Sequence, residues 1–323
     1  MKLNKNLVTI VLSILCLTAV IVQGGDIPGQ LGINGSLKLP PEAILSEPCV
    51  PLLSSTDKVG FVPIVTEGAL VSFSTTTGQM ISSVVVGHNA GLASMVESAG
   101  KRLIAVPTGN TPDQGLAATV SIIDATDPAQ MMPVSLMLMP PAVHFNSATR
   151  AVLTADGRFV LVTSYYPDPT VYSFDTTSGS LVSQIPLIGR TSRMALYESS
   201  PGGEGTVAIA SAASNTVLIL GIDPGGKLTQ SGTFSPSNAS LDEWNNPAFS
   251  SDGHIIYIAA STGAELCAVD AATGALIDSI PMQPSPQGVT VAPNPQGDMI
   301  AVTRIKRAHE EANPGVTLLV SMG

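Results

Sequence analysis

The sequence predicts an all-β protein, and three observations support this fold class. The 323 residues include 30 Gly and 25 Pro, but only 12% are charged, against about 25% in typical soluble domains. Apolar residues occur in short runs between Gly, Pro, Ser and Thr, which is typical of strands joined by turns. One strand-and-turn segment also recurs along the chain. With 44% hydrophobic residues and only three Cys, the composition excludes a disordered chain and a small disulfide-linked scaffold.

The recurring segment is an apolar strand that runs into a polar turn, which usually closes on Gly. Its equivalent turn positions are Ser74, Asp124, Asp175, Asp223 and Asp270. The intervals between them are 50, 51, 48 and 47 residues, and a sixth copy ends the chain at Ser321. A repeat of roughly 50 residues is typical of propeller blades.

Three further strands follow each copy in order. A second strand follows the turn, as at residues 80–86, 181–187 and 275–281. A third strand leads into a hairpin turn such as Asp156-Gly157 or Asp252-Gly253, whose residue types tolerate positive φ. A fourth strand then follows, at residues 103–106, 159–163, 206–210, 255–259 and 299–303. Repeated antiparallel units of four strands predict a β-propeller with four-stranded blades.

One blade is expected to be shared between the two ends of the chain. Residues 36–39, 49–58 and 60–66 have the form of its second, third and fourth strands, and residues 315–320 supply the first. We therefore expect the C-terminal strand to join the N-terminal blade, which would close the ring and leave no free sheet edge. The expected count is six blades, or seven if residues 25–47 contain further strands.

Three segments match a known type of repeat. They are residues 216–220 (Thr-Val-Leu-Ile-Leu), 256–260 (Ile-Tyr-Ile-Ala-Ala) and 286–293 (Pro-Gln-Gly-Val-Thr-Val-Ala-Pro). With them, residues 36–323 resemble the YVTN-type β-propeller repeat family, which is related to the lactonase-like and YncE-like propellers. No copy holds an intact Tyr-Val-Thr-Asn, and residues 161–164 (Leu-Val-Thr-Ser) come near it. The resemblance therefore implies the fold and leaves the activity open.

The N-terminus has the pattern of a secretory signal peptide. Lys2 and Lys5 precede an apolar run at residues 7–22, and small residues follow. We expect residues 1–24 to be a signal peptide or an uncleaved membrane anchor. Residues 25–35 then form an N-terminal segment, and residues 36–323 a single propeller domain. The protein is expected outside the cytoplasm, either secreted, periplasmic or at the cell surface, and attached to a membrane only through such an anchor.

Two cysteines remain after the predicted signal peptide. In an oxidising compartment Cys49 and Cys267 could form one disulfide, and the alternative is two buried thiols that pack as small hydrophobic residues. Their spacing in the sequence does not distinguish between the two.

Charge limits the class of partner. The formal net charge is −10 and the 14 basic residues are mostly scattered, which argues against nucleic acid because phosphate binding needs clustered Lys and Arg. The expected partner is a protein, a glycan or a small molecule, and the protein is expected to be a monomer. No metal site is predicted, because the histidines come from separate repeats without metal-binding spacing. No cofactor is expected.

The connections between strands divide into two sets. In antiparallel sheets the turns from first to second and from third to fourth strand lie at one end, which we call the turn end, and they are short and regular. The remaining connections lie at the other end, the loop end, and are irregular. Variable loops on a rigid scaffold are where binding sites form. The candidate ligand-binding residues of the loop end are His88, His144, Arg190, Arg193, Trp244, Arg304, Arg307 and His309.

No catalytic residue is predicted from motifs. The chain has no Gly-x-Ser-x-Gly and no Ser tied by spacing to a His and an acid. The leading interpretation is therefore a binding scaffold that uses the loop end. One alternative, which the resemblance implies, is a lactonase-like hydrolase at the channel mouth. Another is a structural module of the cell envelope. Residues considered for hydrolysis are Glu67, Asn89, Asn246, Glu265 and Glu310.

Overall fold

The computed structural model shows an all-β chain. It describes residues 10–11, 18–24, 31–38, 51–64, 68–109, 117–141, 143–145, 149–164, 168–189, 193–237, 240–241, 245–260, 265–281, 289–293, 299–304 and 317–321. These residues form 26 strands, arranged in five four-stranded and two three-stranded antiparallel sheets, and no helix. Within these ranges, accordingly, no helix has the length and apolarity needed to cross a membrane.

The chain divides into two compact units. The first consists of residues 1–139 with 146–148, and the second of residues 140–145 with 149–323. The first unit holds three sheets, in chain order β1 (Ile10–Val11), β2 (Thr18–Gly24) and β3 (Leu31–Lys38); β4 (Leu52–Leu53), β5 (Val59–Ile64), β6 (Ala69–Ser74) and β7 (Met80–Val85); and β8 (Ser94–Ser98), β9 (Lys101–Thr108), β10 (Thr119–Asp124) and β11 (Met132–Leu138).

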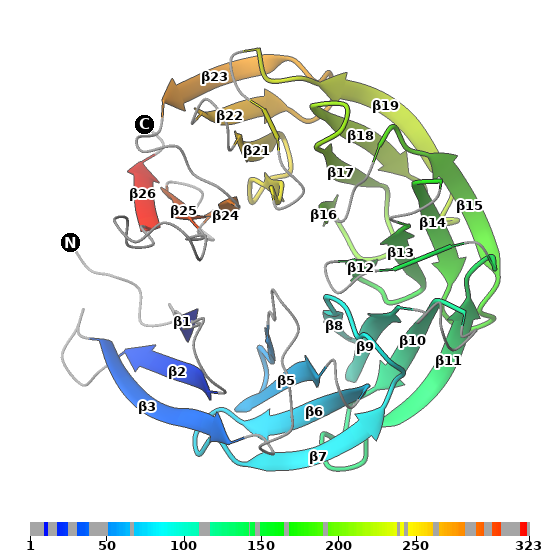
Figure 1. Ribbon diagram of the computed structural model, residues 1–323, viewed down its shortest axis with the longest axis vertical. Coiled ribbons are helices and arrows are strands. Elements are labelled where there is room, and N and C mark those ends of the chain that lie inside the picture. Colours follow the sequence, from blue (N-terminus) through cyan, green and yellow to red (C-terminus); the bar gives the residue numbers. More distant parts are fainter. Residues whose placement is uncertain are drawn as a thin grey trace. The chain divides into compact units, whose positions relative to one another are not determined.

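The second unit holds four sheets (Figure 1). They are β12 (Ala151–Leu153), β13 (Phe159–Thr163), β14 (Thr170–Asp175) and β15 (Leu181–Pro186); β16 (Arg193–Glu198), β17 (Gly205–Ser211), β18 (Thr216–Ile222) and β19 (Leu228–Phe234); β20 (Ala248–Phe249), β21 (Ile255–Ala260), β22 (Glu265–Asp270) and β23 (Leu276–Pro281); and β24 (Val289–Pro293), β25 (Met299–Arg304) and β26 (Thr317–Ser321). The first strands of neighbouring sheets contact one another, β12 with β16, β16 with β20 and β20 with β24. These first strands therefore form the inner edge of the second unit.

The recurring strand is confirmed. Each expected turn residue ends or directly follows the third strand of its sheet: Ser74 ends β6 and Asp270 ends β22, whereas Asp223 directly follows β18. These turn residues hold the hairpins by local hydrogen bonds. Asp175 Oδ1, for example, accepts from the backbone N–H of Thr177 at 3.0 Å and of Ser178 at 2.7 Å. Side chains of this type bond their own backbone in turns, so their recurrence is structural.

The expected start of the repeating unit is wrong by two strands. The recurring strand is third in its sheet instead of first, as in the sheet β4 to β7. The physical reason is burial. Strands such as β5 and β6 are buried along almost their whole length, whereas β7 is mostly exposed. A strand that is apolar on both faces must lie in the middle of a sheet, so two consecutive apolar strands pair at the centre and the alternating strand takes the outer edge.

The expected closure is not seen among the described strands. β26 pairs with β25 in the last sheet, and β3 pairs with β2, so neither makes the expected pairing between the two ends of the chain. The reason is the same shift by two strands, which makes the C-terminal strand the third of its own sheet. The count of six blades is not confirmed either. β3 lies within residues 25–47, on which the seven-blade alternative depended, and β1 and β2 lie within the predicted signal peptide.

Neighbouring sheets are held together by apolar side chains between them. In β17 the side chains alternate between two clusters. Val207 and Ile209 pack with residues of β13 and β14, such as Leu161. Ala208 and Ala210 pack with residues of β20 to β22. The middle strands thus contribute to the core on both faces, and the small alanines suit the narrow space between two sheets.

The interface between the second and third sheets of the second unit gives a test. Gly253 has φ of +75°, and a Cβ at this position would lie 2.1 Å from the Tyr197 ring of the neighbouring sheet. Gly100 has a similar φ of +76° with nothing within 4 Å. Gly100→Ala should therefore lower the free energy of unfolding by about 1 kcal/mol, because only the left-handed backbone is strained. Gly253→Ala should lower it by about 3 kcal/mol, because the new methyl group also clashes with the Tyr197 ring. Urea denaturation measures both free energies of unfolding, and equal losses would show that the ring contact is unimportant.

Candidate functional site

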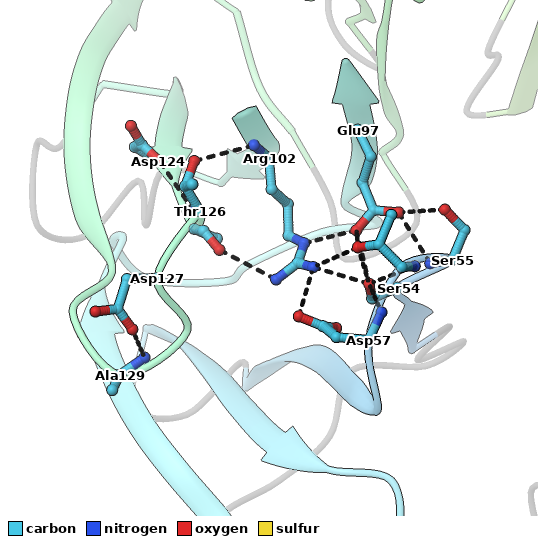
Figure 2. A network of polar contacts seen from close by, with 11 residues as sticks. Ser54, Ser55, Asp57, Glu97, Arg102, Asp124, Thr126, Asp127 and Ala129 are labelled. Atoms are coloured by element: carbon cyan, nitrogen blue, oxygen red, sulfur yellow. Dashed lines mark hydrogen bonds and ion pairs between the residues drawn. The ribbon is translucent and has the colours of Figure 1, made fainter. Parts of the chain in front are cut away.

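One dense polar cluster lies at the turn end of the first unit, where it joins two sheets (Figure 2). The buried Arg102 of β9 donates from Nε to Glu97 Oε1 at 2.8 Å, and from Nη2 to Asp57 Oδ2 at 2.9 Å. Its guanidinium also lies 5.3 Å from the centre of the Phe61 ring. Two carboxylates therefore compensate one buried cation.

Hydrogen bonds hold both charges of this cluster in their ionised forms. Burial by itself raises the pKa of Glu97, but hydrogen bonds from Ser55, Ser54 and Arg102 outweigh it and lower the pKa to about 2. Burial likewise lowers the pKa of Arg102, but hydrogen bonds to Asp57 and Glu97 raise it above its usual value. With its charges satisfied internally, the cluster is a structural connection between sheets and offers little to a ligand.

The second unit repeats part of this connection. Glu198, at the end of β16, accepts a hydrogen bond from the backbone N–H of Ala155 in the turn between β12 and β13. Among the described residues no arginine joins this contact, and burial raises the pKa of Glu198. A carboxylate at the turn end of an inner strand thus ties down the turn of the preceding sheet in both units.

The candidate functional site lies at the loop end of the second unit. Arg150 directly precedes β12, and its Nη1 donates to Oδ1 of Asn246 at 3.2 Å. Asn246 precedes β20, in the third sheet of this unit. The two positions are equivalent, because Thr154 and Ser250, four residues further on, each accept from the N–H five residues later in matching turns. The contact therefore joins equivalent corners of two sheets that are separated by a third.

Further polar residues with buried side chains lie at the same end of these sheets. Arg193 begins β16, the inner strand of the intervening sheet, and is only 7% exposed. Asn245 is fully buried next to Asn246. Ala151 of β12 pairs with Val162 of β13, so the same register continued by one residue places Arg150 opposite Thr163. The Thr163 hydroxyl is buried, and it has no hydrogen-bond partner among the described residues.

The charge of Arg150 is not compensated in the way that the charge of Arg102 is. Within the described part of the chain, Arg150 takes part in no ion pair. Burial lowers the pKa of its guanidinium, and no carboxylate of the described residues acts against this effect. A guanidinium carries five N–H donors, so most of the hydrogen-bonding capacity of Arg150 is left for a bound molecule.

The predicted ligand-binding residues lie in different parts of the structure. Arg193 belongs to the candidate site, and the half-buried His144 lies in the connection that leads to Arg150. His88 is exposed in the first unit, between β7 and β8. Arg304 ends β25 at the loop end of its sheet, and its side chain is outside the described atoms. Four predicted residues lie outside the described ranges: Arg190, Trp244, Arg307 and His309.

Arg150 was not among the predicted residues, although a signal for it exists. The turns that contain Asp156 and Asp252 match in sequence, and counting back from them aligns Arg150 with Asn246. An isolated arginine before a short strand matches no motif, so only this alignment could identify it. The part of the chain that the structure describes holds no group of three or more His, Cys, Asp or Glu residues that could bind a metal ion.

The predicted disulfide is not tested by the structure. Cys267 of β22 is a buried free thiol, and burial together with Glu265 raises its pKa to about 12. Cys49 lies outside the described residues. Pairing of the two cysteines therefore stays a prediction.

Comparison with known proteins shows the fold alone. No protein-family model and no curated protein matches the sequence. The solved β-propeller domain of Swd1 from Myceliophteria thermophila is 15% identical with a TM-score of 0.64, over 89% of this chain and 87% of that one. A Lactobacillus plantarum protein is 15% identical with a TM-score of 0.63, over 91% and 87%. Kuenenia stuttgartiensis hydrazine synthase is 12% identical with a TM-score of 0.63, over 94% and 89%. The chain therefore has a β-propeller fold.

The turn-end cluster gives a pH-dependent test. The pKa of Glu97 is lower in the folded protein than in the unfolded chain, so its contribution is present above the unfolded pKa of about 4.5 and is lost as the pH falls towards 2. Glu97→Gln should lower the free energy of unfolding by about 2 kcal/mol at pH 7, and the difference from the unmodified protein should shrink between pH 4.5 and 2.

Chemical denaturation across that pH range measures the difference. Glu204→Gln is the control, because Glu204 is an exposed acid and should show little effect at any pH. A difference for Glu97→Gln that stays constant with pH would contradict the assignment.

Proposed function

We propose that this protein is an extracytoplasmic β-propeller that acts as a ligand-binding scaffold through the loop end of its second unit. The contact between Arg150 and Asn246 carries the proposal, because it joins two sheets at a point where donors remain available. In a structural connection such as the Arg102 cluster, the same capacity is used up internally.

The cost of burial supports a binding role over a structural one. Removing a polar group from water costs free energy unless the group forms a hydrogen bond within the protein. At the loop end, the Thr163 hydroxyl and the guanidinium of Arg150 bear this cost without full compensation from described residues. A bound molecule that supplies acceptor atoms would form hydrogen bonds with these groups and so offset the free-energy cost of their burial.

The sequence supports the proposed location and kind of propeller. The basic and apolar N-terminus resembles a signal peptide, and residues 36–323 resemble YVTN-type repeats. Translocation is tested by fusing residues 1–35 to alkaline phosphatase, which is active only after export. We expect phosphatase activity from the fusion. Activity no higher than that of a fusion with Lys2 and Lys5 replaced by Glu would contradict export.

A second candidate function is lactone hydrolysis, and one observation favours it. Glu265 begins β22 at the loop end, and its Oε2 is buried without a hydrogen-bond partner among the described residues. A buried carboxylate with a free oxygen could act as a general base. Turnover of sugar or acyl lactones that disappears in Glu265→Gln would establish this function, and no turnover by the unmodified protein would exclude it for those substrates.

Ligand binding is tested by thermal denaturation of the purified protein with a panel of sugars, peptides and organic acids. We expect at least one compound to raise the melting temperature of the unmodified protein and not that of Asn246→Ala, because this substitution removes the acceptor that positions Arg150. Arg158→Gln is the control, since Arg158 is exposed at the turn end of the same hairpin.

The circular dichroism spectra of both variants should match that of the unmodified protein. Stabilisation that persists in Asn246→Ala would place the site elsewhere. No stabilisation by any compound would favour the envelope-module interpretation.

A further inference from the structure

Two arginines of this fold, the buried Arg102 and the half-buried Arg150, differ in how their charge is balanced. Arg102 at the turn end of the first unit has two carboxylates within 3 Å. Arg150 at the loop end of the second unit has as its described partner the neutral amide oxygen of Asn246. A cation partly withdrawn from water is stabilised by a counter-charge, and among the described residues Arg150 has none, so an added anion would stabilise this arrangement.

The two described carboxylates at this end of the fold do not supply that anion. Asp168 lies in the connection between β13 and β14, and Glu265 begins β22, both at the loop end. Neither forms an ion pair with Arg150 within the described residues. Burial also lowers the pKa of Arg150, as expected for a guanidinium that lacks a nearby negative charge.

The geometry of Arg150 suits an oxyanion. The hydrogen bond from Nη1 to Asn246 fixes one arm of the planar guanidinium and leaves the others free. Such a fork pairs with the two oxygens of a carboxylate, or with two of a phosphate, through parallel hydrogen bonds. The amide nitrogen of Asn246 and the hydroxyl of Thr163 are further polar groups at the same corner.

A second arginine begins the neighbouring inner strand. Arg193 begins β16, whose strand contacts β12, and its side chain is buried at the same end of the sheet. Neighbouring inner strands thus place two arginines at the loop end of a protein with a net charge of −10. That net charge repels polyanions, so the site suits a small anion and not a nucleic acid.

We propose that the loop end of the second unit binds a small ligand through an oxyanion group, either a carboxylate or a phosphate, held by Arg150 with Arg193 beside it. The inference rests on the proposed function, because it names the chemical class of the ligand for the same site. Arg150 is the residue that contacts the anion, and Asn246 is a positioning residue that acts through it.

The experiment uses citrate, inorganic phosphate and glucose as probes, each titrated into the full-length protein by isothermal calorimetry at a constant ionic strength set with NaCl. We expect citrate or phosphate to bind and glucose not to bind. Binding of citrate alone identifies a carboxylate ligand, and binding of phosphate alone identifies a phosphate ligand. Arg150→Gln should weaken the binding about tenfold or more, because it removes a charged hydrogen-bond donor.

Two variants keep the result interpretable. Arg150→Lys retains the charge but not the fork, so it should bind more tightly than Arg150→Gln and less tightly than the unmodified protein. Arg158→Gln removes an exposed arginine at the opposite end of the hairpin and should bind like the unmodified protein.

Two outcomes would overturn the inference: no binding of either oxyanion, or equal binding by Arg150→Gln. In that case, a neutral compound that raises the melting temperature of the unmodified protein but not of Asn246→Ala would leave the proposed function standing. Only the assignment of the ligand to the oxyanions would fail. If no compound bound at all, both would fail.

Discussion

The fold depends on burying both faces of the two middle strands in each sheet. β13 is buried along its whole length and β17 along most of it, and the side chains of β17 alternate between two apolar clusters on its two sides. Each sheet therefore needs a neighbour on either side. This requirement favours small and β-branched residues in the middle strands, whereas the outer strands, such as β7, are mostly exposed.

The same constraint gives the two ends of the sheets different roles. Short hairpins at the turn end close on themselves through residues such as Asp175 and are tied to the next sheet by Glu97 or Glu198. Polar groups there are satisfied within the protein. At the loop end the connections are irregular, and Arg150 and Thr163 keep hydrogen-bonding capacity that the described residues do not use. Rigidly packed sheets thus hold polar groups with unused hydrogen-bonding capacity at the loop end. A propeller can bind a ligand through such groups without a conformational change.

Much of this could be predicted from the sequence, and the failures have physical causes. Turn residues repeat because each hairpin needs them, so Asp124 and Asp270 located the third strands correctly. The start of each sheet was misplaced because a repeat has no natural first strand, and only burial on both faces distinguishes middle strands from edges. Arg193 was a candidate because it follows an irregular connection, whereas Arg150 was not, because its hydrogen bond is to a residue 96 positions away. No local pattern contains that information.

In this proposal, a small anion balances the charge of the half-buried Arg150. X-ray diffraction from crystals of the full-length protein grown in bromide, recorded at the bromine absorption edge, would test it directly. Bromide scatters anomalously and occupies sites that favour anions. The account predicts an anomalous peak within hydrogen-bonding distance of the Arg150 guanidinium and none at Arg102, whose charge is already balanced. Bromide bound only at exposed lysines, with the Arg150 guanidinium paired to a carboxylate of the protein itself, would contradict it.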